Sequence, residues 1–189
     1  MDAPSRAELD VGDCSAVEEW FAGRPAYDLA VCAAGVTKDR PFLKQTEDEW
    51  DAVMGVNARG AAWCARCAAA GMLREGREGQ VVMIGSYAAY RPAPSQAAYA
   101  ASKSALEGLV KSLAREWGKK GIRVNLVLPG FMLTDMTEGL RGSVKEAALS
   151  RHVLGRFNTP EQTAAFLLFL QEALTAASGQ VFDLDSRIL

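Results

Sequence analysis

A serine, a tyrosine and a lysine stand at a spacing that suits proton transfer. Ser86, Tyr99 and Lys103 form the pattern Ser-x12-Tyr-x3-Lys, and Asn57 lies upstream within Gly-Val-Asn-Ala. Tyr99 and Lys103 are four residues apart, so on a helix they share one face. Ser86 follows the apolar run 81–85, which is typical of a buried strand. A hydroxyl at a strand end that faces a Tyr/Lys pair can move a proton to or from a carbonyl oxygen.

An ammonium group near the tyrosine would lower the pKa of the tyrosine hydroxyl. A free tyrosine has a pKa near 10 and is a poor acid or base at neutral pH. An ammonium about 4 Å away, at an effective dielectric of about 20, favours the phenolate by roughly 4 kcal/mol. That corresponds to about three units of the tyrosine pKa. The alternative is a surface Tyr and Lys on an amphipathic helix, but the added serine at a strand end favours a site.

Strand and helix signals alternate along the chain, and these elements must position the four residues. The pattern predicts strands over 7–11, 29–34, 80–84, 122–128 and 180–184, a charged turn over 71–79, and helices over 13–21, 47–70, 97–118 and 160–170. Apolar strands separated by helices indicate a parallel sheet covered on both faces. The 189 residues contain no repeat or linker, so we expect one α/β domain, 1–189.

Composition narrows the class of function. The net charge is −2 and no face carries a run of Lys and Arg, which argues against a nucleic-acid partner. The longest apolar stretch, 164–170, is far shorter than the roughly 18 residues of a membrane helix. The N-terminal residues lack the apolar segment of a signal peptide. We expect a soluble cytoplasmic protein without a membrane partner.

The cysteines favour packing over redox or metal chemistry. Cys64 and Cys67 match C-x-x-C but fall inside a predicted helix, whereas a redox pair belongs at a helix N-terminus. A zinc site needs further ligands, and His152 is the only histidine. We therefore expect no metal, small packing roles for the cysteines, which also include Cys14 and Cys32, and a surface or loop position for His152.

At these residues the chain resembles the short-chain dehydrogenase/reductases, and most closely their 3-oxoacyl-(acyl carrier protein) reductase branch. The segment from Ile84 to Lys103 resembles the catalytic strand and helix of that family. Further matches are Asp10-Val11 on the adenine side, Val124-Asn125, 129–131 and 134–136 in the nicotinamide-side loop, and 155–157, 159–161 and 178–181 near the C-terminus. The resemblance runs from about Leu9 to Asp185, nearly the whole chain.

The resemblance implies a Rossmann-type doubly wound parallel sheet and a carbonyl reductase that uses NADP or NAD. Tyr99 would be the acid/base, Lys103 would hold the ribose and tune the tyrosine, Ser86 would hold the substrate, and Asn57 would relay protons through a water. The implied cofactor-binding residues are Asp10, Val11, Ala33, Ala34, Gly35, Tyr99, Lys103, Pro129, Gly130 and Thr134, the last on the carboxamide.

Three features depart from the family pattern. Asn-Asn-Ala-Gly is replaced by Cys-Ala-Ala-Gly at 32–35, and the closing Asp-Gly-Gly by Asp-Ser-Arg at 185–187. The glycine-rich turn that seats a pyrophosphate on a helix N-terminus is missing. We therefore expect an N-terminally truncated fold without the first strand, the glycine-rich loop, the first helix and the second strand. Arg6 either meets a 2′-phosphate, which slightly favours NADP, or is an ordinary terminal arginine.

The truncation would leave the strand 29–34 with an open apolar edge, which invites pairing. Three arrangements are open: the segment 7–11 moves into the gap, a second chain fills it, or the natural protein is longer. The leading function is reduction of a small-molecule or 3-oxoacyl thioester carbonyl. The alternative is a non-catalytic, cofactor-deficient partner protein. In both cases we expect a homodimer or homotetramer, and the resemblance implies that its contact is formed by the helices 47–70 and 97–118.

Overall fold

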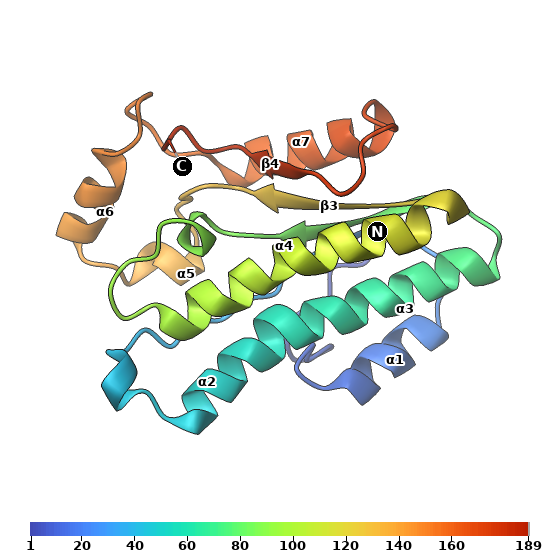
Figure 1. The fold of residues 1–189 in the computed structure, drawn as a ribbon, viewed down its shortest axis with the longest axis horizontal. Coiled ribbons are helices and arrows are strands. Elements are labelled where there is room, and N and C mark those ends of the chain that lie inside the picture. Colours follow the sequence, from blue (N-terminus) through green and yellow to red (C-terminus); the bar gives the residue numbers. More distant parts are fainter. Residues whose placement is uncertain (189) are drawn as a thin grey trace.

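A parallel sheet forms the centre of the molecule (Figure 1). The computed structural model describes residues 1–188. Its strands are β1 (Leu29–Cys32), β2 (Gly79–Ile84), β3 (Ile122–Leu128) and β4 (Val181–Asp183), and they lie side by side in that order. In register, Met83 of β2 lies between Cys32 of β1 and Leu126 of β3. All of these strands therefore present their C-terminal ends at one edge.

The helices alternate with the strands, as the α/β pattern predicts. They are α1 (Cys14–Ala22), α2 (Glu47–Met54), α3 (Ala61–Arg74), α4 (Ala97–Trp117), α5 (Asp135–Glu138), α6 (Gly142–Leu149) and α7 (Pro160–Glu172). Local chemistry fixes several of their starts: the Asp13 carboxylate caps α1, and Thr46 and Thr159 form capping boxes at α2 and α7. Pro160 stands in the first turn of α7, where a missing N–H costs nothing.

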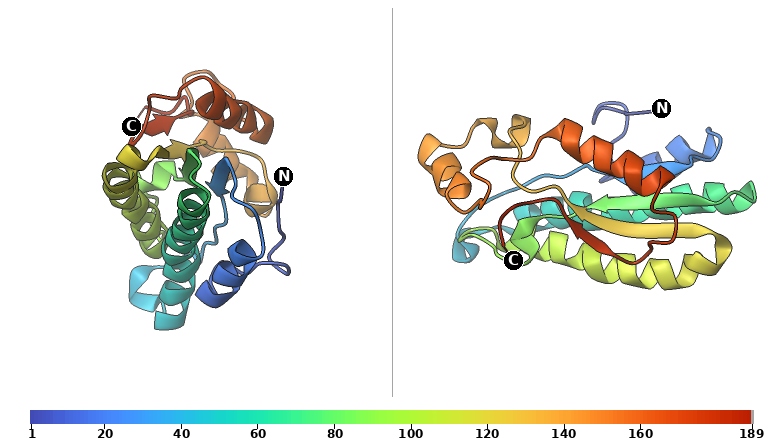
Figure 2. Two further views of the ribbon diagram at one scale, coloured as in Figure 1. Left: turned by 90° about the vertical axis from the view of Figure 1, so that its right-hand side faces the viewer. Right: turned by 90° about the horizontal axis from the view of Figure 1, so that it is seen from above.

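The sheet separates two apolar layers (Figure 2). Val81 and Met83 of β2 pack with residues of α3 and α4 on one face, and α1 covers α3 from outside. Val82, between them in sequence, points to the other face and packs with Val127 and Leu170 of α7. Alternation along buried strands therefore places α3 and α4 on one side and α7 on the other, with α4, which carries Tyr99 and Lys103, held against the sheet.

The predicted long helix over 47–70 is interrupted. A π-helix, Gly55–Gly60, separates α2 from α3, and α3 continues to Arg74 through the segment predicted as a turn. Asn57 lies in this π-helix, and π-helical turns are often found at functional positions. Helical periodicity alone does not reveal the extra residue of such a turn.

The predicted strand over 7–11 is wrong. The backbone N–H groups of Glu8 and Leu9 both donate to Ser5 O, at 3.1 and 3.0 Å, which makes a turn. The Glu8 carboxylate accepts a bond from Ser5 N at 2.8 Å. These local bonds outweigh the weak strand propensity of so short a segment.

β1 lies at the edge of the described sheet. Its Val31 side chain is 38% exposed. Because residues 7–11 form no strand, the first of the three expected arrangements is excluded within the described residues. A second chain and a longer natural protein both stay open as predictions.

The sequence predicts a surface or loop position for His152, and the loop position is confirmed. It lies in the loop after α6, but only 5% of the residue is exposed. Its Nδ1 lies 2.8 Å from Ala148 O, and its Nε2 lies 2.8 Å from Asp185 Oδ1. Partners distant in sequence bury this histidine, so no local pattern could place it.

Three further expectations concern metal sites, the cysteine thiols and membrane-spanning helices. Cys64 and Cys67 lie inside α3, as predicted, and burial raises the pKa of the Cys64 thiol to about 11. Within residues 1–188, no group of three or more His, Cys, Asp or Glu side chains is placed to hold a metal ion. In the same range, no helix has both the length and the apolar character needed to cross a bilayer.

Gly60 is predicted to be indispensable for the packing of the N-terminal segment. A Cβ there would meet Val11 O at 2.6 Å and Val11 Cγ2 at 3.0 Å. We expect Gly60→Ala to lower the free energy of unfolding by about 1–3 kcal/mol, because backbone must move. Urea denaturation followed by circular dichroism measures the change.

Gly108→Ala on α4 is the matched control, since its Cβ would meet nothing within 4 Å. Here alanine should stabilise the helix by up to about 1 kcal/mol. Equal stability of the two variants would contradict the close contact at Gly60.

Candidate active site

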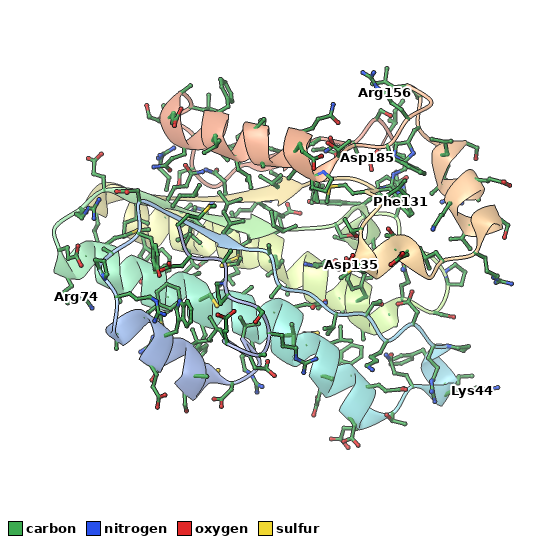
Figure 3. The ribbon with its side chains drawn as sticks, turned by 180° about the vertical axis from the view of Figure 1, so that it is seen from behind. Lys44, Arg74, Phe131, Asp135, Arg156 and Asp185 are labelled. Carbon is green, nitrogen blue, oxygen red and sulfur yellow. The ribbon has the colours of Figure 1, made fainter. Side chains whose placement is uncertain are left out.

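Three elements bring the predicted catalytic residues to the C-terminal edge of the sheet. Ser86 lies two residues after the end of β2, Tyr99 and Lys103 lie on α4, and Asn57 lies in the π-helix between α2 and α3. Phe131, Asp135 and Asp185, which follow β3 and β4, lie at the same end of the sheet (Figure 3). The carboxyl edge of a parallel sheet is where such folds bind ligands.

The side chain of Asn57 ties three segments together. It is fully buried, and its Oδ1 accepts a hydrogen bond from Val36 N at 2.8 Å. Its Nδ2 donates to Val36 O at 2.9 Å and to Ser102 Oγ at 3.0 Å. Ser102 Oγ in turn donates to Tyr99 O at 2.7 Å. Asn57 thereby fixes the loop after β1 against the helix that carries Tyr99.

Lys103 is a buried ammonium group. The residue is 4% exposed, and its Nζ donates to Ile84 O at 2.8 Å. Burial lowers the pKa of Lys103 to about 8, and the nearby Cys32 opposes this shift only in part. Nζ lies 3.6 Å from the position a Cβ on Gly35 would take. The lysine therefore reaches across the end of β2 to the loop after β1.

The electrostatic effect of Lys103 on Tyr99 is not the one predicted. Burial raises the pKa of Tyr99, while the neighbouring Ser86 hydroxyl lowers it and Asp39 raises it further. The ammonium lies 5.9 Å from the centre of the Tyr99 ring, over its face. Lys103 is not among the groups that shift the pKa of Tyr99, so in the free chain desolvation dominates and Tyr99 is a neutral phenol at neutral pH.

Ser86 serves as the cap of a short helical turn. Its Oγ accepts a hydrogen bond from Ala88 N at 3.1 Å, at the start of the 3₁₀-helix η3 (Tyr87–Ala89). Its backbone is extended, so the hydroxyl stands at the junction between β2 and this turn. The same oxygen keeps a donor proton for a further partner.

A groove of about 650 Å³ opens beside the loop after β1, where it is lined by Gly35 and by Val36, the hydrogen-bond partner of Asn57. The four predicted catalytic residues are not among its lining residues. Its walls include Asp10 and Gly12 from the N-terminal segment, Gly35 from the loop after β1, Arg59 from the π-helix, and Met136 from α5. This volume lies within the range of pockets that bind small ligands. Asp10 Oδ1 accepts from Gly12 N at 2.9 Å, which orients the carboxylate at the groove.

The residues fit parts of a nicotinamide dinucleotide. Within residues 1–188, Ile84 O is the hydrogen-bond partner of Lys103 Nζ, so two of the three ammonium donors are left for a ligand. Gly35 presents backbone without a side chain directly beside this ammonium. Lys103, Gly35 and Asp10 would hold the group, which supplies a hydride when bound.

The remaining predicted cofactor residues do not gather at the groove. Ala33 and Ala34 are exposed in the loop after β1, whereas Val11 packs on Gly60 rather than lining the groove. The carbonyl of Pro129 accepts from Asn158 Nδ2 at 2.7 Å. Gly130 has φ +83°, and Thr134 directly precedes α5, where its N–H donates to Thr137 Oγ1 at 3.0 Å.

Sequence reasoning missed Ser102, Val36 and Ile84 as parts of the site. Ser102 lies three residues after Tyr99, which places its hydroxyl near the Tyr99 carbonyl on the same helix. That spacing was a usable signal. Val36 and Ile84 act through their backbone atoms, which the residue types do not reveal.

Comparison with known proteins agrees with this geometry. The family model described as enoyl-(acyl carrier protein) reductase matches residues 2–186. The 3-oxoacyl-[acyl-carrier-protein] reductase FabG of Thermotoga maritima is 38% identical over 163 residues, which are 86% of this chain and 66% of that protein. An acetoacetyl-CoA reductase of Synechocystis is 39% identical over 159 residues, 83% of this chain and 65% of that protein. The chain thus spans about two thirds of the length of these relatives.

Solved structures share the fold. A protein described as a 2-deoxy-D-gluconate 3-dehydrogenase from Agrobacterium tumefaciens, with bound NADP, gives a TM-score of 0.87 at 31% identity and covers 94% of this chain and 73% of its own. A 4-hydroxyisoleucine dehydrogenase complexed with NADH gives 0.89 at 28% identity, over 94% of this chain and 76% of its own. Both structures contain a nicotinamide dinucleotide.

Removing the side chain of Asn57 should loosen the whole site. Asn57→Ala leaves Val36 N, Val36 O and Ser102 Oγ without their partner. We expect a loss of about 2–4 kcal/mol in the free energy of unfolding, because buried polar groups become unsatisfied. Chemical denaturation measures it.

Asn158→Ala is the control, since Asn158 also bonds backbone, at Pro129 O, but lies away from α4. A loss for Asn57→Ala no larger than about 0.5 kcal/mol, the range of ordinary surface substitutions, would contradict the linking role of Asn57.

Proposed function

The chain belongs to the short-chain dehydrogenase/reductase family, and from this premise we propose that it reduces a carbonyl group to an alcohol with a nicotinamide cofactor. The observation that carries the proposal is the buried Lys103 ammonium beside Tyr99 and the Ser86 turn at the carboxyl edge of the sheet. Burying a charge is costly unless a partner repays it. A bound anion or polyol at this edge would do so.

The proposed mechanism gives each side chain one task. Ser86 keeps a donor proton, which can hold the substrate carbonyl oxygen. Tyr99 is a neutral phenol at neutral pH, because burial raises its pKa, so it can give its proton to that oxygen as negative charge develops. Lys103 is charged below about pH 8 and would stabilise the phenolate that remains. A dinucleotide held at this site would supply the hydride.

Asn57 would contribute mainly by position. Both of its Nδ2 donors are engaged, and Oδ1 keeps one lone pair after accepting from Val36 N. A water held there could pass protons onward, as the family resemblance implies. Its larger task is to keep Ser102, and with it the Tyr99 turn of α4, in place.

The proposed substrate is a 3-oxoacyl thioester. The support comes from the relatives named for 3-oxoacyl-[acyl-carrier-protein] and acetoacetyl-CoA. Met136 of α5, which is 49% exposed, lines the groove, and Leu133, just before α5, is 60% exposed. These apolar side chains suit an acyl chain better than a sugar. For the cofactor we slightly favour NADP, because Arg6 also lines the groove and is exposed for a phosphate.

The second candidate is a non-catalytic partner protein. The observation behind it is the open edge of β1, a surface that can pair with another chain.

For either function we propose a homodimer or homotetramer. The large apolar side chains of α4 are not among the exposed ones of the described residues, whereas Leu168 and Phe169 of α7 are 56% and 51% exposed. We therefore add α7 to the long helices as a candidate contact.

Tyr99→Phe tests the proposed acid directly. With acetoacetyl-CoA as the probe substrate and NADPH as the reductant, we expect kcat to fall by about 10²–10⁴-fold because the transferred proton is lost. Cofactor affinity should not change. Loss of NADPH absorbance at 340 nm is the measurement.

Tyr27→Phe is the matched control, because Tyr27 bonds Asp2 away from the groove and its variant should retain full activity. A Tyr99→Phe variant within about twofold of the wild type would contradict the assignment, as general acids contribute far more than that.

The pH profile should report Lys103. In reduction, kcat/KM is expected to be level near pH 7 and to fall as the pH rises through about 8, because the ammonium then loses its proton. Tyr99 stays protonated over this range, since its pKa is raised. Lys103→Arg keeps the charge and should remove the fall near pH 8. A rise of kcat/KM from pH 7 to 9 would contradict the assignment.

A further inference from the structure

The C-terminal segment 185–187 returns to the edge of the sheet that carries the site. Figure 3 shows Asp185 close to Phe131, beside the loop that follows β3. The Asp185 side chain is 1% exposed. A Cβ on Gly130 would lie 2.9 Å from Asp185 Cγ, and Gly130 has φ +83°, so only glycine fits there. Asp185 is therefore locked against the loop after β3.

Asp185 fixes the guanidinium of Arg187. Arg187 Nε donates to Asp185 Oδ2 at 2.6 Å, and Nη2 forms an ion pair with the same oxygen. The backbone N–H of Arg187 donates to Asp185 Oδ1 at 3.0 Å. His152 Nε2 lies 2.8 Å from that oxygen, without hydrogen-bond geometry. With its side chain only 11% exposed, Arg187 is held in one orientation.

The fixed guanidinium lies on the ring of Tyr87. Arg187 Cζ is 3.9 Å from the ring centre. Planar stacking of this kind suits arginine and not lysine. Tyr87 directly follows Ser86 and is the first residue of the turn that Ser86 caps. The contact therefore restrains the short segment whose backbone geometry determines the position of the Ser86 hydroxyl.

We propose that Arg187 is a positioning residue for Ser86, acting through Tyr87. The contacts run from Gly130 and Asp185 to Arg187, then to Tyr87 and the Ser86–Ala88 cap. The turn η3 is only three residues long and has little internal support. The inference rests on the substrate-binding role of Ser86 in the proposed function. It assigns a task to the segment 185–187, where the sequence departs from the family pattern.

Hydrogen exchange of the free chain tests the positioning without any turnover. Ala88 N–H donates to Ser86 Oγ, and the N–H groups of Ala89 and Tyr90 close the same turn. In Arg187→Ala we expect these amides to exchange about tenfold faster, because local opening becomes easier while the rest of the fold keeps its protection. Tyr87→Phe keeps the stacking face and should leave the three amides unchanged.

The kinetic readout separates positioning from general destabilisation. Arg187→Ala should lower kcat for acetoacetyl-CoA about tenfold or more, because a small displacement of an orienting group is costly, while cofactor affinity is unchanged. Arg187→Lys keeps the charge but not the planar stacking, so it should resemble alanine. Full activity of Arg187→Lys would overturn the stacking role.

Exchange at 88–90 that stays at the wild-type rate in Arg187→Ala, or that rises equally throughout the chain, would overturn the proposal. Because this measurement needs no substrate, it decides the role of Arg187 even if the wild-type chain proves inactive. Inactivity of the wild type would instead refute the proposed function.

Discussion

The side chain of Asn57 makes the hydrogen bonds on which the site depends. Its amide satisfies both backbone groups of Val36 and reaches Ser102 on α4, so the loop after β1, the π-helix and α4 are held in one arrangement. The group is fully buried, where an unpaired amide is expensive. Asn57 belongs to the π-helix between α2 and α3, so the geometry of this helix determines where the Asn57 side chain lies relative to Val36 and Ser102. Without the hydrogen bonds of Asn57, this network would not hold the Tyr99 turn of α4 and the Gly35 loop in a fixed relative position.

A second constraint is electrostatic. Lys103 is charged, buried and bonded to the carbonyl at the end of β2, and the cost of its burial is visible in its lowered pKa. Tyr99 shows the opposite consequence of burial, a raised pKa. At neutral pH the phenol therefore keeps its proton, and the ammonium keeps its charge 5.9 Å from the centre of the tyrosine ring. In the free chain, the desolvation of Tyr99 and Lys103 outweighs the electrostatic attraction between them, whereas the sequence predicts that this attraction dominates.

Much of the fold follows from residue patterns. The bounds of β3 agree with prediction, and Asp13, Thr46 and Thr159 begin their helices as caps do. Periodicity failed where local bonds or helix geometry intervened, at the Ser5–Glu8 turn and at the π-helix. The proposed catalytic set rests on residue types and spacing, which a single sequence displays, and its catalytic role stays a prediction. The burial of His152 and the stacking of Arg187 on Tyr87 depend on tertiary contacts with distant residues, which no single-sequence pattern contains.

The central claim is that this chain, which spans about two thirds of its curated relatives, itself holds the cofactor that its proton-transfer residues require. The most direct test is a calorimetric titration of the 189-residue chain with NADPH and, separately, with NADH. We expect an affinity in the micromolar range, with NADPH slightly tighter. Absence of binding by either cofactor at millimolar concentration would contradict the claim and favour the non-catalytic partner protein.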